Sequence, residues 1–131
     1  MRISLLSLCF VFACQQPCPP VDCNENVDIM VPTSTFLTTP DTDTAFTVHI
    51  SNGASTTICT MELSGGTLTP GACNDRASEV SLVGDQVQFR YARDPKRIQV
   101  RIMDGSTLLD EGTFEVDYSG DRCCQYGEVT M

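Results

Sequence analysis

The chain has 131 residues, with 17 acidic and 8 basic side chains and a formal net charge of −9. This length fits one small domain, and the acidic balance disfavours nucleic-acid binding, which rests on basic patches that meet phosphate. Eight cysteines in so short a chain are typical of exported proteins, in which disulfides supplement a small core.

The first 13 residues have the pattern of a secretory signal peptide. Arg2 supplies one positive charge, and residues 3–13 are apolar apart from two serines and carry no charge. A charged start followed by a short apolar run that ends in a small residue is the signature of such a leader. The run is too short for a membrane-spanning helix, which needs about 20 apolar residues.

Cys14 is the candidate for lipid attachment. The segment Val11-Phe12-Ala13-Cys14 resembles the lipobox of bacterial lipoproteins, in which a small residue precedes the acylated cysteine, although Phe12 is bulkier than is usual there. The alternative is ordinary secretion, because Val11 and Ala13 also suit a signal peptidase that cuts the same bond. The two interpretations differ in whether Cys14 carries lipid.

Residues 14–26 are predicted to be a tether. Pro17, Pro19 and Pro20 favour extended, polyproline-like backbone between the lipid site and a folded domain. Cleavage after Ala13 removes Cys9, and acylation would occupy Cys14. Six cysteines are then left, and this even number suits a disulfide framework.

From residue 27 onward the apolar side chains alternate with polar ones, which is typical of strands with one buried and one wet face. The inward residues are predicted to be Val27, Ile29 and Val31; Phe46, Val48 and Ile50; Cys59, Met61 and Leu63; Val80 and Leu82; Val87, Phe89 and Tyr91; Ile98, Val100 and Ile102; and Phe114, Val116 and Tyr118. A last run over 125–131 is expected to close the sheet. No stretch has a helical apolar stripe of useful length.

Turn signals rich in Gly and Pro separate these runs about every ten residues. The segments 94–96 and 104–106 are predicted to be tight hairpin turns, and residues 64–71 a Gly- and Pro-rich loop before Cys73. The pattern predicts an all-β fold over residues 27–131, namely an antiparallel, immunoglobulin-like β-sandwich of about seven or eight strands stapled by disulfides.

The six remaining cysteines allow 15 pairings, and the sequence alone does not choose among them. We expect Cys59 to pair with Cys73, closing a 15-residue loop that adds about 3 kcal/mol of stability. Because first and last strands are often neighbours in sandwiches, Cys18 and Cys23 would then bind Cys123 and Cys124. These last four thiolates could instead hold zinc, but disulfides are favoured in an exported protein.

No catalytic constellation stands out. His49, the one histidine, is predicted on a polar strand face with Ser51 two residues on, without a motif that adds an orienting carboxylate. Five loop acids are candidates for calcium ligands: Asp41, Asp43, Asp104, Asp110 and Glu111. They do not match the helix-loop-helix calcium pattern, so we predict solvated carboxylates, no metal, no cofactor and no enzymatic activity.

The lipobox-like segment, residues 104–109, residues 114–118 and Cys123-Cys124 together resemble a group of small bacterial lipoproteins. The resemblance implies an acylated cysteine, a Pro-rich spacer and one disulfide-bonded immunoglobulin-like sandwich. It implies a lipid-anchored location at the outer membrane or cell surface of a Gram-negative bacterium, and a non-catalytic module that binds an envelope or extracellular protein or glycan or has a structural role. The alternatives are a secreted, unlipidated sandwich and a weak metal-dependent hydrolase using His49 and loop carboxylates.

Overall fold

The structure, a computed structural model, describes residues 25–38, 42–121 and 124–131. In these ranges the chain forms ten strands and one short helical turn. In chain order they are β1 (Asn26–Pro32), α2 (Ser34–Leu37), β2 (Thr44–Ser51), β3 (Thr56–Ser64), β4 (Thr67–Cys73), β5 (Glu79–Val83), β6 (Gln86–Tyr91), β7 (Arg97–Asp104), β8 (Thr107–Glu115), β9 (Tyr118–Asp121) and β10 (Cys124–Thr130).

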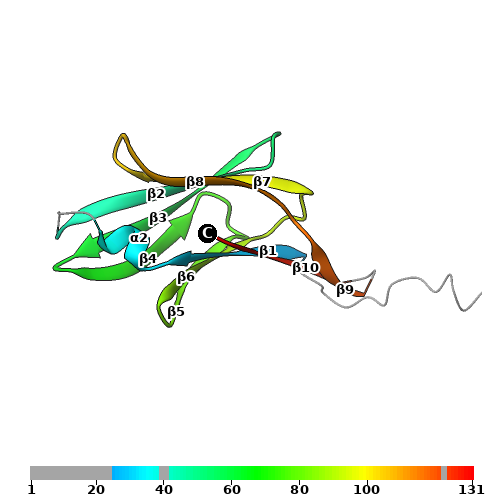
Figure 1. Cartoon of the computed structure of the whole chain (residues 1–131), viewed down its shortest axis with the longest axis horizontal. Coiled ribbons are helices and arrows are strands. Elements are labelled where there is room, and N and C mark those ends of the chain that lie inside the picture. Colours follow the sequence, from blue (N-terminus) through cyan, green and yellow to red (C-terminus); the bar gives the residue numbers. More distant parts are fainter. Residues whose placement is uncertain (1–24, 39–41, 122–123) are drawn as a thin grey trace, which may run out of the picture.

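The strands form two five-stranded sheets that lie against each other (Figure 1). One sheet has the order β5-β6-β1-β10-β9 and the other β4-β3-β2-β7-β8. Neighbouring strands are antiparallel except for β1 and β10, which run parallel. The prediction of a sandwich-like all-β domain is confirmed in this coarse form, and the first and last strands are neighbours as expected. The predicted seven or eight strands are ten in the described residues, because residues 64–71 contribute to β4 and the apolar run 113–118 is divided between β8 and β9.

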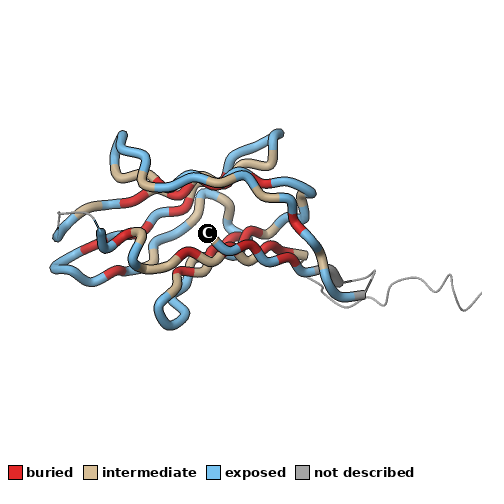
Figure 2. Tube along the Cα trace, in the orientation of Figure 1, coloured by how far each residue is buried: buried red, intermediate tan, exposed pale blue. Residues whose placement is uncertain are grey.

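The core lies between the sheets, where the inward residues of both form one buried layer (Figure 2). Alternation places side chains of β1, β2, β6 and β7 on this face, because successive residues of a strand point to opposite sides. The completely buried side chains include Tyr91, Phe36, Phe46, Phe89, Ile29, Ile50, Met61, Ile98, Ile102, Val27, Val31 and Val48. All except Phe36 belong to the predicted inward set.

Phe36 enters the core from α2, a single helical turn that the sequence pattern did not reveal. The turn follows β1 directly, and its backbone is joined to the β5–β6 turn by the Thr33 N–H, which donates to the Asp85 carbonyl. The Phe36 ring meets Phe46 edge-on, with ring centroids 5.1 Å apart. Leu37, the next residue, is 48% exposed, so the turn buries one side chain only.

β4 lies where a loop was predicted. Pro70 and Gly71 are turn-forming residues, but here they belong to an edge strand that pairs only with β3. An edge strand tolerates proline because its missing N–H can face away from the neighbouring strand. The register shifts between Cys59 and Met61, and a Cβ on Gly71 would come within 2.6 Å of the Thr60 carbonyl oxygen.

Two further predictions were wrong in connectivity. Residues 94–96 do not close a hairpin but carry the chain from β6 in one sheet to β7 in the other. Phe114, Val116 and Tyr118 do not share one strand, because β8 ends at Glu115 and β9 starts at Tyr118 in the opposite sheet. By contrast, Asp104 pairs with Thr107 across the predicted two-residue turn.

The two ends of the sandwich differ in the elements that meet there. At the entry end, β1 begins at Asn26 beside the end of β6, and the connections 52–55, 74–78 and 92–96 lie together. At the far end, the β3–β4 and β7–β8 turns lie beside the start of β2. Figure 1 shows β1 starting on the right, at the entry end.

Candidate binding surface at the entry end

The Cys59–Cys73 disulfide is present, as predicted. The two residues face each other across β3 and β4, and Cys59 is 1% exposed within the core. Cys14, Cys18, Cys23 and Cys123 lie outside the described residues, and Cys124 is described only as the first backbone position of β10. Lipidation, the other predicted bridges and the zinc alternative thus stay predictions.

His49 lies on the outer face of its sheet. Its Nε2 is 3.2 Å from the Thr47 hydroxyl oxygen, and its partners on the neighbouring strands are Ile58 and Arg101. The hydrogen bond therefore goes to Thr47 and not to Ser51. Because a catalytic pair needs a carboxylate to orient the imidazole, this environment gives the hydrolase hypothesis no support.

The candidate calcium ligands have separate structural roles. Asp43 accepts the Gly65 N–H at 2.8 Å, and Asp104 accepts the Thr44 hydroxyl at 2.7 Å. Asp110 accepts the N–H of Glu111 at 2.9 Å, while Glu111 pairs with Arg101 at 3.5 Å. Asp41 lies outside the described residues. Within the described ranges, no three His, Cys, Asp or Glu side chains are grouped to hold a metal ion.

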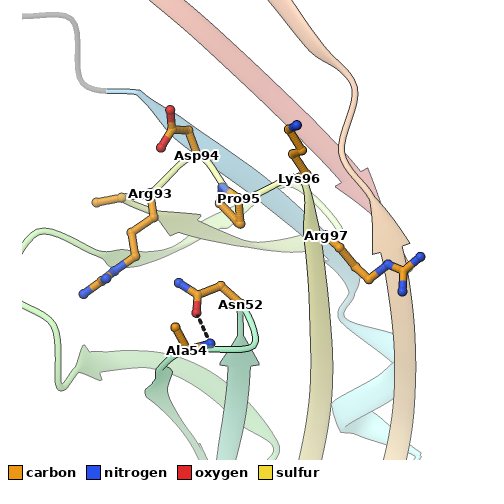
Figure 3. Close-up of a pocket in the computed structure, with 8 residues that line it drawn as sticks. Asn52, Ala54, Arg93, Asp94, Pro95, Lys96 and Arg97 are labelled. Carbon is orange, nitrogen blue, oxygen red and sulfur yellow. Dashed lines mark hydrogen bonds between the residues drawn. The ribbon is translucent and has the colours of Figure 1, made fainter.

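The entry end carries an open depression of about 630 Å³. Residues of the 52–55 turn and of the 92–97 segment line it: Asn52, Ala54, Ala92, Arg93, Asp94, Pro95, Lys96 and Arg97. Figure 3 shows Asn52 facing the segment from below, while the charged ends of Arg93, Lys96 and Arg97 point in different directions. These cations therefore do not converge on one small ligand.

Asn52 shapes one wall through its own side chain. Its Oδ1 accepts the N–H groups of Ala54 and Ser55, both at 2.9 Å. Gly53 supplies the positive φ of 92° that the turn requires. Side-chain to backbone bonds of this kind fix a turn without secondary structure, so the β2–β3 wall is preformed.

Three hydrogen bonds hold the opposite wall. The Ala92 N–H donates to the buried Ser78 hydroxyl at 3.1 Å, and the Val116 N–H donates to the Lys96 carbonyl at 2.9 Å. The Tyr118 hydroxyl donates to the Pro95 carbonyl. These bonds tie the loop to the 74–78 connection and to residues 116–118, and they hold the backbone that carries the cations in place.

Four acids of this end contact neighbouring groups, and a fifth, Asp117 in the β8–β9 connection, is exposed. Asp75 accepts the Ala77 N–H and the Ser78 hydroxyl, both at 3.1 Å. Glu115 pairs with Arg97 at 2.6 Å. A side-chain hydrogen bond with Asp94, together with the charge of that carboxylate, raises the pKa of Glu25 above its ordinary value, because one proton is favoured between two close carboxyl groups.

Two tyrosines lie beneath the loop. Burial, and then the charge of Asp94, raises the pKa of Tyr118 to about 12. Burial also raises the pKa of Tyr91, against the opposing charge of Arg93. The neighbouring Asn52 carboxamide also opposes the rise in the Tyr91 pKa, but the Tyr91 hydroxyl makes no hydrogen bond with any described residue.

A smaller depression of about 260 Å³ adjoins the first, sharing Asn52 and Arg97 with it. Ser51, Gln99 and Thr113 lie side by side across three strands in its floor. The hydroxyl, amide and guanidinium groups here can donate and accept hydrogen bonds. Both depressions are open, so the surface is suited to contact with a large partner.

Sequence reasoning missed this surface. Its signal was the clustering of basic residues, since five of the eight Lys and Arg residues fall between positions 90 and 101. That cluster stands out in a chain with 17 acidic residues.

Comparison of the chain with protein-family models, curated proteins and solved structures found no match. Within the described ranges, no helix has the length and apolar character needed to cross a membrane.

Proposed function

We propose that the protein is an exported lipoprotein, acylated on Cys14, that presents a non-catalytic β-sandwich as a binding or structural module of the cell envelope. The protein would be anchored at the outer membrane or cell surface. Its partner there would be an envelope or extracellular protein or a glycan.

The observation that carries export is the Cys59–Cys73 disulfide. Disulfides persist in oxidising compartments and are rare in the cytosol. Together with the apolar leader over residues 1–13, the bridge supports passage across the inner membrane.

Anchoring is supported by the position of Cys14 relative to the domain. β1 begins at Asn26, so 11 residues separate it from Cys14. Fully extended, such a stretch reaches about 40 Å. A lipid on Cys14 would therefore keep the sandwich close to the membrane surface.

We further propose that the sandwich is of the immunoglobulin-like class. Two facing sheets of mostly antiparallel strands support this, as do repeated crossings of the chain between them. The strand order, with β1 in the middle of its sheet, differs from the four-plus-three arrangement of constant-type immunoglobulin domains.

The test is the membrane attachment of Cys14→Ser, expressed from the full-length chain in a Gram-negative host. The wild type should sediment with membranes and leave them only with detergent, while the variant should be soluble in the periplasm or medium. Ser106→Ala, an exposed change in the far-end β7–β8 turn, is the control. A wild type that is released by salt alone would contradict the anchor and leave the secreted, unlipidated alternative.

A further inference from the structure

We propose that the entry end of the sandwich rests on the anionic lipid headgroups of the membrane that carries the anchor, through the exposed side chains of Arg76, Arg93 and Lys96. This inference rests on the proposed lipidation of Cys14. It adds a second, electrostatic contact that orients the domain.

The three cations are available for such a contact. Three other basic residues of the described chain are paired: Arg90 with Asp28, Arg97 with Glu115 and Arg101 with Glu111. Within the described residues, Arg76, Arg93 and Lys96 have no ion-pair partner, and all three are exposed. A surface cation without an ion-pair partner can bind a phosphate without first breaking an existing ion pair.

The fold gathers these cations from two connections. Arg76 and Arg93 line one open depression of about 480 Å³, and Arg93 and Lys96 line the neighbouring one. Asp75, the acid beside Arg76, is held by Ala77 and Ser78.

The position of the cations identifies the occupant. They lie at the end where β1 begins, which is the end that a chain anchored at Cys14 would turn toward the bilayer. Their charged ends diverge (Figure 3), so a single phosphate would not reach them all, whereas a plane of phosphates would. Each Lys or Arg near an anionic membrane contributes about 1 kcal/mol, or about a fivefold change in binding.

The far end has the opposite character. Its turns and strand ends carry Asp43, Glu62, Asp85 and Asp104, and no lysine or arginine occurs in the described far-end segments 42–44, 62–67, 84–86 and 104–107. An anionic membrane repels such a surface. Attraction at one end and repulsion at the other would both favour the same orientation.

Lys96 reports the contact directly, because it is the only lysine of the chain. The full-length lipidated protein is reconstituted in vesicles of phosphatidylcholine, alone or with roughly 30% phosphatidylglycerol. An amine-selective acetylating reagent is added, and the rate of Lys96 modification is read by mass spectrometry. The same digest shows whether Cys14 is acylated, so failure of the anchor is distinguished from failure of the contact.

We expect phosphatidylglycerol to slow Lys96 acetylation about threefold or more, and about 0.5 M salt to abolish the effect. Arg76→Gln/Arg93→Gln should lose most of the protection. A control variant, Ser106→Lys, places a second lysine in the exposed far-end turn, and this introduced lysine should react equally on both vesicles.

Three results would overturn the proposal. One is equal acetylation of Lys96 on neutral and anionic vesicles when Cys14 is shown to be acylated. Another is an equal decrease in the acetylation rates of Lys96 and of the introduced far-end lysine in the Ser106→Lys protein. This result would show that the electrostatic potential of the anionic vesicle acts on the whole domain, and that the entry end makes no specific contact with it. The third is equal protection by soluble inorganic phosphate without anionic lipid, which would indicate a site for a free anion.

Discussion

Removing the Cys59–Cys73 bridge should lower the free energy of unfolding by about 3 kcal/mol. The cysteines are 14 residues apart in sequence, and closing a loop of this size restricts the unfolded chain by about that amount. The structure adds a reason for the effect to be felt in β4, which is an edge strand with one neighbour, interrupted by a register shift.

The perturbation is Cys73→Ala, compared with Cys59→Ala and with the double variant. Cys73 is half-buried while Cys59 is 1% exposed, so Cys59→Ala should cost about 1 kcal/mol more than Cys73→Ala through lost packing. Urea unfolding gives the free energies, and its slope should rise in every variant because the unlinked unfolded chain exposes more surface. For a domain of this size, a loss of about 3 kcal/mol corresponds to a fall in Tm of roughly 10–15 °C.

A loss below about 1 kcal/mol in the double variant, with an unchanged slope, would refute this reasoning. It would mean that the unfolded chain is already restrained or that β4 contributes little to stability. Hydrogen exchange of the β4 amides with and without the bridge separates these cases. Unchanged rates would indicate a restrained unfolded chain, whereas faster exchange in β4 alone would show that β4 opens at little cost to the rest of the domain.

Three further predictions concern single side chains. Phe36→Ala should lower the free energy of unfolding, measured in urea, by about 3–5 kcal/mol because the ring is completely buried against Phe46. Leu37→Ala, at the neighbouring residue that is 48% exposed, should lower it by less than about 0.5 kcal/mol. Equal losses would show that α2 does not anchor in the core. Tyr91→Phe should leave stability unchanged or raise it by up to about 1 kcal/mol, because it removes a buried hydroxyl without a partner, and a clear loss of stability would reveal a partner such as a bound water. Tyr118 should ionise near pH 12, as read from phenolate absorbance. Because its folded pKa lies above the ordinary value of 10.0, its contribution is complete below pH 10 and is lost as the pH rises toward 12, so Tyr118→Phe should flatten the alkaline fall in Tm.

Most of the sheet residues could be predicted because alternation has a direct physical cause. Val27, Phe46 and Ile98 begin three apolar runs of period two, and each run is a strand with that face buried. The same alternation does not indicate which of the two sheets a strand joins. Val116 and Tyr118 continue the pattern of Phe114 because both sheets face one core, so the crossing between β8 and β9 leaves the alternation unbroken.

Turn-forming residues gave a wrong prediction where the position of the segment in the sheet determined its structure. Pro70 and Gly71 predict a loop in isolation, yet an edge strand accepts both. Only one part of the candidate surface could be predicted from the sequence. The basic cluster over residues 90–101 is legible in the sequence, but the approach of Arg76 to Arg93, and the location of both beside the start of β1, follow from the pairing of strands far apart in the chain.

The measurement that tests the proposed anchor most directly is the mass of the N-terminal peptide of the mature protein, isolated from membranes of the expressing cell. We expect a peptide that begins at Cys14 and carries the added mass of a diacylglyceryl group, with further acylation on its amine. A peptide that begins at Met1, or one that begins at Cys14 without lipid, would contradict the proposed anchor and with it the orientation of the entry end on the membrane.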